Sequence, residues 1–392
     1  MLDAAHYDGL ACALLDGDGY ALRVPAGRTA TSCGRPFAGD NPPTAFRPPG
    51  WPVVLAGVYG VSAPVTEHRW TAARVAQALI GTLAVALIGL LAWRLLGPAG
   101  GLAALALAAV DTTLLGVGAS LMSEPLFVCL VAGSLLAALA AREGGRRWLV
   151  AAGVLIGLAT LVRTNGLVLV PVLALLASRR PRDWAVVAGC AVLAIAPWTV
   201  RNAVVMDAFV PVASYFGTGL AGTFNESTRT RTDHPGGWQS PRNVPELRDV
   251  HLSGMSELDK QAELRRRALR HLREHPGYAV EVAGRNAARM LSLGDVGWQR
   301  SNAGALGLPP WAGLTMAAGF WVLLALAAIA VVAGPARRLP WAWWLGPPLL
   351  VLSAALLGGE LRYRAPVEPF LIVAAAALVA RPFRPNVPRC GL

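Results

Sequence analysis

Acidic and arginine side chains stand near the ends of long apolar runs in this sequence. The candidate functional residues among them are Asp3, Glu124, Arg163, Arg201, Arg362 and Arg364. Arginine stays charged and donates paired hydrogen bonds to phosphate, whereas a carboxylate beside a hydroxyl can act as a base. The set therefore suits a reaction in which a hydroxyl is deprotonated and a phosphate leaves.

Further polar residues accompany these charges. Tyr7 comes one helical turn after the first acid, and Asn165 and Tyr363 stand beside the arginines, so we predict that all three line the same site. Asp111 lies inside the apolar stretch LALAAVDTTLLGV, where an acid is costly unless it is paired or reaches a wet cavity. Either a hydrogen bond to a neighbouring helix through the adjacent threonines or a place in a substrate cavity accounts for it.

The composition defines the class of protein that must position these groups. The 392 residues are 55% hydrophobic and 15% charged, with a mean hydropathy of +0.48, which predicts a polytopic membrane protein. The net charge of +12 is carried almost entirely by arginine, since Lys260 is the only lysine, and it suits anionic lipids and phosphate ligands. A nucleic-acid partner is not expected, because the arginines are interspersed between apolar spans.

Apolar runs close to the roughly 20 residues that cross a bilayer recur along the chain. We predict nine spans, at 72–96, 101–119, 123–141, 147–163, 165–180, 183–200, 311–334, 340–357 and 367–381. Alternate connections carry Arg94, then Arg142, Arg146 and Arg147, then Arg179, Arg180 and Arg182, then Arg337 and Arg338, and finally Arg381, Arg384 and Arg389. By the positive-inside rule these connections are cytoplasmic, so the candidate site is extracytoplasmic.

This pattern divides the chain into four parts. Residues 1–69 form a first extracytoplasmic loop with surface helices at 3–15 and from 48, and 70–200 form a six-helix transmembrane core. Residues 201–310 form a large extracytoplasmic loop with helices at 256–274 and 278–293, and 311–392 hold three spans and a cytoplasmic tail. Because residues 1–69 need an export device, we expect a transmembrane helix to precede them.

Each candidate residue also has an ordinary structural explanation. Asp3 could be a frayed terminal acid, and Glu124 could serve only the start of the helix that continues through Pro125. The arginines could anchor to lipid headgroups at the interface. Cys12 and Cys33 could pair in an oxidising compartment, and the histidines have no spacing that predicts a metal site.

Several motifs together resemble a known family. They are DAAHYDGLACALLDGDGY and PTAFRPPGWPVVLAGVYGV, followed by SEPLF, LATLVRTNGLVLVP, APWTVRNAVVMDAFVPVA and RYRAPVEP. In this order they resemble the GT-C membrane glycosyltransferases of the bacterial branch similar to protein O-mannosyltransferases and lipid A aminoarabinose transferases (glycosyltransferase family 39-like). The resemblance covers most of the chain and is weakest at 203–310.

This resemblance implies a GT-C-like helical bundle, an activity and roles for the residues. Such enzymes transfer a sugar from a polyprenyl-phosphate donor to an extracytoplasmic acceptor, with an acid of the first external loop as base. By position that acid is Asp3, with Glu124 as the second acidic position. Two departures are Ala4, where the protein mannosyltransferases have a second acid, and Thr164, where a proline commonly follows the arginine. Some relatives use a divalent cation, but no ligands are assigned in this sequence.

We therefore expect an inverting glycosyltransferase of the bacterial plasma membrane that acts on a cell-envelope glycan, lipid or protein. The alternatives are a transporter or flippase for lipids or sugar-lipids, and a noncatalytic envelope assembly protein. A transporter predicts polar residues continuing to the cytoplasmic side and two related halves, neither of which the sequence has. A noncatalytic protein predicts that Asp3 and Glu124 can be replaced by alanine without loss of function.

Overall fold

The computed structural model describes residues 2–22, 33, 42–65, 68–252 and 254–380. Within these residues the chain is helical and contains no strand, only an isolated bridge between Ala21 and Pro43. The predicted all-α class is confirmed. The predicted cytoplasmic tail, with Arg381, Arg384, Arg389 and Cys390, lies outside the described residues.

The helices form a bundle and an outer layer. The bundle contains α3 (Arg69–Leu96), α4 (Pro98–Val110), α5 (Thr112–Ala119), α6 (Glu124–Glu143), α7 (Arg146–Val162), η1 (Thr164–Leu169), α8 (Val170–Ala177), α9 (Pro181–Met206), α16 (Pro310–Val332), η4 (Pro335–Arg338), η5 (Trp341–Leu345), α17 (Gly346–Ala355), η6 (Leu361–Val367) and α18 (Glu368–Ala376). The outer layer contains α1 (Leu2–Leu15), α2 (Gly50–Ser62), α10 (Phe216–Thr223), α11 (Glu226–Thr230), η2 (Pro241–Asn243), η3 (Pro245–Leu247), α12 (Arg248–Leu252), α13 (Glu257–Glu274), α14 (Pro276–Met290) and α15 (Val296–Ala305).

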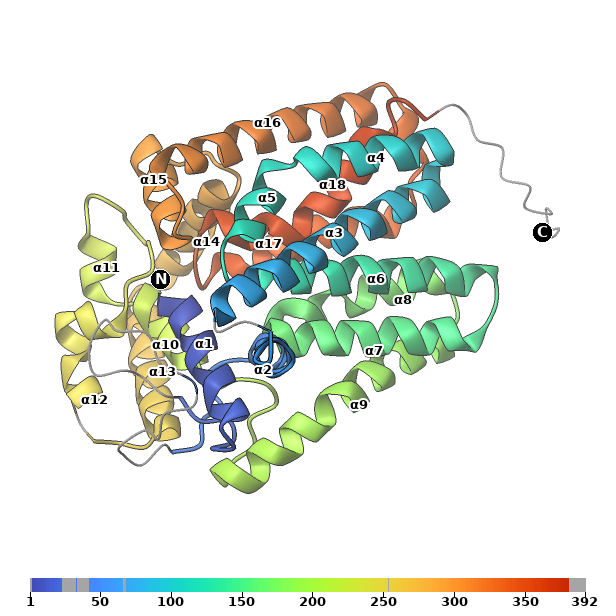
Figure 1. Cartoon of the computed structure of the whole chain (residues 1–392). Helices are drawn as coiled ribbons and strands as arrows, with labels where there is room; N and C mark the ends of the chain where they lie inside the picture. The colour runs from blue at the N-terminus through green and yellow to red at the C-terminus, as the bar shows by residue number, and fades with distance from the viewer. Residues whose placement is uncertain (1, 23–32, 34–41, 66–67, 253, 381–392) are drawn as a thin grey trace.

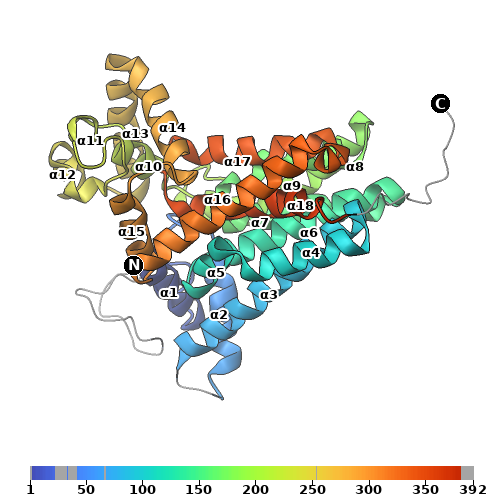
Figure 2. The same ribbon diagram turned by 90° about the horizontal axis from the view of Figure 1, so that it is seen from above.

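The long bundle helices run side by side, and the outer layer gathers at one end of them, on the left in Figure 1. Figure 2 shows the same separation from a second direction, with α10 to α15 on one side of this end and α1 and α2 on the other. The turn between α6 and α7 lies at the opposite end, so α6 begins and α7 ends beside the outer layer. This arrangement places Glu124 and Arg163 at the same end of the bundle, as predicted.

The bundle is apolar enough to cross a membrane. Four helices among the described residues are long and apolar enough to span a bilayer by themselves, namely α3, α6, α9 and α16. The bent pair α4 and α5, with 49° between its helices, would make a fifth span. The other predicted spans are also helical, but they are shorter or interrupted by 3-10 turns near prolines, so the count of nine stays a prediction.

Two glycines allow α7 and α9 to pack closely. A Cβ on Gly153 would lie 2.5 Å from the carbonyl oxygen of Val187, and a Cβ on Gly157 would lie 2.6 Å from that of Ala191. Small residues four apart let the backbones of membrane helices approach each other. This contact holds α7, the helix that Arg163 follows, against α9.

We expect the substitution Gly157→Leu to lower the free energy of unfolding by about 1 to 3 kcal/mol, because the added side chain must separate α7 from α9. The matched control is Gly189→Leu on the outer face of α9, where an added Cβ meets no atom within 4 Å. Denaturant titration of both variants in detergent micelles measures the difference. Equal stability of the two variants would contradict the close packing.

Candidate active site

A network of ion pairs joins the outer layer to the bundle around Asp3. Its carboxylate, on α1, pairs with Arg47 and accepts a hydrogen bond from Arg362 at 2.8 Å. Arg362 also pairs with Glu360, whose chain segment lies between α17 and η6. Asp3 and Arg362 are 359 residues apart in the chain, so only the tertiary fold brings them together.

Glu124 lies behind this pair and connects it to Arg163. The carboxylate is 1% exposed at the start of α6 and accepts a hydrogen bond of 2.7 Å from Arg163. Its Oε1 lies 3.6 Å from the Nε of Arg362, while its Oε2 is buried without a hydrogen-bond partner among the described residues. Glu124 therefore holds two arginines in place from the inner side of the cluster.

Two tyrosines complete the cluster. The guanidinium groups of Arg163 and Arg362 lie 5.2 Å and 5.3 Å from the ring centre of Tyr363, close enough for cation–π attraction. The Tyr7 hydroxyl lies 3.4 Å from the hydroxyl of Ser123, just before Glu124. Tyr363 therefore contacts the arginines of the ion pairs, and Tyr7 contacts the residue next to Glu124.

The charges around Asp3 decide its protonation state. Burial alone would raise the pKa of the Asp3 carboxyl, but the charges of Arg47 and Arg362 outweigh burial and hold this pKa well below the usual range. Burial, and then the charge of Arg47, lower the pKa of the neighbouring His6 to about 4. At neutral pH Asp3 is therefore a carboxylate and His6 is an uncharged imidazole.

A cavity of about 1030 Å³ opens beside the cluster. One wall holds Asp3, His6, Arg47, Glu360, Arg362 and Tyr363. Residues of α10 and α13 also line the cavity, and there the Thr218 amide donates to the Gln261 side chain at 2.9 Å. The outer layer thus covers a charged pocket that is large enough for a sugar and a phosphate.

We expect His6 to make the free energy of unfolding fall as the pH is lowered below about 6.5, the usual histidine pKa. The loss extends to about pH 4, the pKa of folded His6, because in this window the unfolded chain binds a proton that native His6 does not. Unfolding in detergent at a series of pH values should show this slope, and His6→Gln should reduce it. His234→Gln is the control outside the cavity, and an unchanged slope in His6→Gln would contradict burial of an uncharged His6.

Arg47 is a member of the cluster that the sequence alone did not single out. Besides pairing with Asp3, its guanidinium lies 5.3 Å from the ring centre of Phe46, and its Nε is buried without a partner among the described residues. The signal was present in the motif PTAFRPPGW, where an arginine occurs in a predicted extracytoplasmic loop. The positive-inside rule makes an arginine in such a loop unusual, which is a signal for a functional role.

Arg201 and Asn165 lie apart from the cluster. Arg201 donates to the carbonyl oxygens of Thr44 at 2.8 Å and Tyr20 at 3.2 Å, so it ties α9 to the segment after α1. Asn165 donates to the Ser353 hydroxyl at 3.5 Å, between η1 and α17. These bonds give both residues a structural role, and their predicted place in the phosphate site stays a prediction.

Arg364 and Asp111 also belong to the interior of the bundle. Arg364 is fully buried, lies 3.3 Å from Glu368 and donates to the Met290 carbonyl oxygen at 3.1 Å. Asp111 ends α4 and caps α5, since its carboxylate accepts the Leu114 amide at 2.8 Å. Neither residue lines the cavity beside Asp3, so the structure gives both a structural role, while the predicted phosphate and cavity roles stay predictions.

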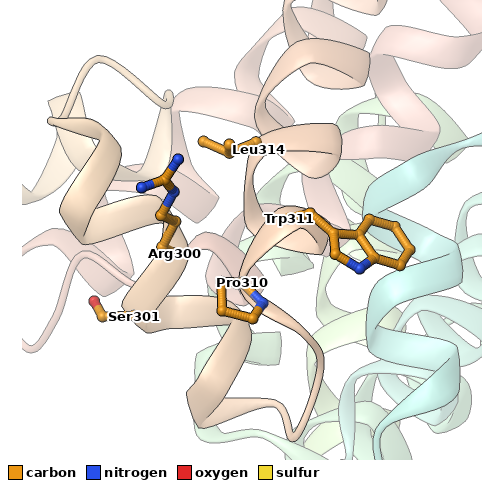
Figure 3. A pocket seen from close by; sticks show the side chains of 5 residues that line it. All are labelled: Arg300, Ser301, Pro310, Trp311 and Leu314. Atoms are coloured by element: carbon orange, nitrogen blue, oxygen red, sulfur yellow. The ribbon is translucent and has the colours of Figure 1, made fainter.

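A disulfide bond and two further features complete the description. Cys12 on α1 is bonded to Cys33, a pairing that the sequence left open. A second hollow is lined by Arg300, Ser301, Pro310, Trp311 and Leu314, of which none is a carboxylate or a member of the cluster (Figure 3 shows these five side chains). Within the described part of the chain, no group with metal-ligand spacing includes Asp3 or Glu124.

The fold and the cavity define a helical membrane protein with a charged pocket at one end of its bundle. Residues 47–200 match a family model described as dolichyl-phosphate-mannose-protein mannosyltransferase. The matched segment contains Arg47, Glu124 and Arg163 of the cluster. Over this segment the resemblance seen in the motifs is confirmed. No curated protein sequence matches the chain significantly.

Solved structures with a similar course of the chain include two of ArnT from Cupriavidus metallidurans. The structure bound to undecaprenyl phosphate is 14% identical with a TM-score of 0.42, and the apo structure is 17% identical with a TM-score of 0.39. They cover 96% and 97% of this chain and 73% of their own. The archaeal oligosaccharyltransferase AglB from Archaeoglobus fulgidus, in complex with an inhibitory peptide and a dolichol-phosphate, is 14% identical with a TM-score of 0.46 and covers 96% of this chain and 46% of its own.

Proposed function

We propose that this protein is an inverting glycosyltransferase that takes a sugar from a polyprenyl-phosphate donor. The observation that carries the proposal is the pair of arginines, Arg47 and Arg362, that bind the Asp3 carboxylate at the wall of the cavity. A base and two phosphate-binding groups are thus in contact. The family match at 47–200 supports the same donor class, because its description names a polyprenyl-phosphate sugar.

Binding of the donor exchanges the partners of the arginines. The phosphate takes hydrogen bonds from Arg47, whose buried Nε has no partner among the described residues, and from Arg362. Asp3 then loses part of the positive charge that lowers its pKa, and its basicity rises. The arginines therefore keep the base ionised before donor binding and free it afterwards.

The transfer step follows from this geometry. The acceptor hydroxyl gives its proton to the Asp3 carboxylate while its oxygen attacks the anomeric carbon of the sugar. The bond from that carbon to the phosphate oxygen breaks on the opposite face, so the configuration inverts and polyprenyl phosphate leaves with the bonding electrons. Arg47 and Arg362 stabilise the charge that develops on the phosphate. Glu124 is a positioning residue, because it contacts arginines rather than the cavity.

The site is proposed to face the extracytoplasmic side of a bacterial plasma membrane. The arginine-rich connections at the opposite end of the bundle support this orientation, as does the disulfide between Cys12 and Cys33, a bond typical of oxidising compartments. The acceptor is then a glycan, lipid or protein of the cell envelope.

The test is sugar transfer from a panel of radiolabelled polyprenyl-phosphate sugars by membranes that contain the protein. We expect one donor class to support transfer, and Arg47→Gln to raise the KM for that donor about 10- to 100-fold through loss of charge-assisted hydrogen bonds. Arg266→Gln, on an exposed face of α13, is the control. Transfer from no donor by well-expressed protein would favour the transporter or assembly function instead.

A further inference from the structure

A second group of polar side chains meets in the outer layer, away from the cavity beside Asp3. Glu226 begins α11, His271 lies in the last turn of α13, and His275 follows the end of that helix. One ligand atom from each lies within 4.8 Å of the others. The two histidines are four residues apart, and their ring centres are 4.8 Å apart. The fold therefore brings three metal-binding side chains to one point.

His271 has a nitrogen that lacks a partner. Its Nε2 is buried and forms no hydrogen bond within the described part of the chain. A buried polar atom without a partner costs free energy, which a bound cation would recover. An imidazole nitrogen with a free lone pair is a common metal ligand, and this nitrogen lies in the group.

The charges around the group are compatible with a cation. Glu226 accepts hydrogen bonds from Arg229 at 2.7 Å and 2.9 Å. Each carboxylate oxygen keeps a second lone pair, so Glu226 can bind a cation while it stays paired with this arginine. Glu274 adds a second negative charge near His271. The positive charge of Arg229 would repel a bound cation, but the Glu226 carboxylate already pairs with it.

We propose that Glu226, His271 and His275 bind a divalent transition-metal ion of the zinc class, with water as the remaining ligand. Two imidazoles and a carboxylate are a typical zinc ligand set. Zinc–nitrogen bonds of about 2.0 to 2.1 Å require the three ligand atoms, which lie within 4.8 Å of one another, to move closer together through side-chain rotation. The ion would join α11 to the end of α13, the helix whose Lys260 and Gln261 line the cavity. Its role is to stabilise the cover of the cavity.

The test uses the full-length protein, purified in detergent with a tag that contains no histidine and stripped of metal by a chelator. After addition of Zn²⁺ and desalting, we expect about one zinc per chain by elemental analysis and a higher thermal midpoint, reversed by chelator. Co²⁺ should give the visible absorption of a tetrahedral site without thiolate charge-transfer bands.

Matched variants locate the ion. His275→Gln and Glu226→Gln should each weaken Zn²⁺ binding at least about tenfold and abolish the thermal shift, since even outer partners of metal ligands have effects of this size. His234→Gln is the control, because that ring packs on Trp298 outside the group. Wild-type protein that retains no zinc, or variants that retain as much as the control, would overturn the proposal. None of these readouts depends on sugar transfer, so they stand apart from the proposed activity.

Discussion

Replacing Asp3 by asparagine should lower kcat for sugar transfer about 100- to 10,000-fold, the usual contribution of a general base. Asparagine keeps the size of the side chain and can still accept a hydrogen bond from Arg362, so the fold and donor binding should persist. The loss should therefore appear in kcat rather than in the KM for the donor. Initial rates with the donor identified in the transfer screen measure both constants.

The matched control is Asp233→Asn, which removes a carboxylate from an exposed ion pair with Arg231. This variant should transfer sugar at the wild-type rate. If Asp3→Asn keeps most of the wild-type kcat, Asp3 is a structural partner of Arg47 and Arg362, and the base lies elsewhere. If it loses donor binding instead, the carboxylate acts mainly by orienting the arginines.

Replacing Glu124 by glutamine should lower the free energy of unfolding by about 3 to 5 kcal/mol, the usual cost of breaking a buried ion pair by removing one partner. The carboxylate is 1% exposed, and its loss leaves Arg163 and Arg362 without their shared counter-charge. Glutamine fills the same space, so the effect is one of charge and not of a cavity. Denaturant titration in detergent micelles measures the change.

An exposed pair gives the comparison for Glu124. Asp249→Asn breaks the ion pair with Arg267, in which Asp249 is 62% exposed, and should cost at most about 1 kcal/mol. Adding Arg163→Met to Glu124→Gln should recover part of the stability, because the stranded charge is then removed. A Glu124→Gln variant as stable as Asp249→Asn would show that the pair contributes little to folding.

Much of the helical layout was predictable because it depends on local sequence. The expected surface helix at 256–274 is α13, which runs from Glu257 to Glu274, and its start is capped by the Ser256 side chain, which accepts the Asp259 amide at 3.2 Å. Hydrophobic runs likewise marked the bundle helices, and the short turn between two of them placed Glu124 and Arg163 at the same end. Glu124 and Arg163 are 39 residues apart, and the two antiparallel helices between them return the chain to the same end, where the ion pair forms.

The sequence by itself determined the helical membrane class and most members of the charged cluster, since apolar length and the positions of charges at helix ends are local properties. Only the tertiary structure decided which charges meet. It brought Arg47 and Arg362 to Asp3. It placed Arg364 in the interior of the bundle, although Arg362 and Arg364 stand in the same motif, RYR. Hydropathy records how far a segment prefers an apolar environment and not which segment packs beside it. Contacts across hundreds of residues depend on that packing.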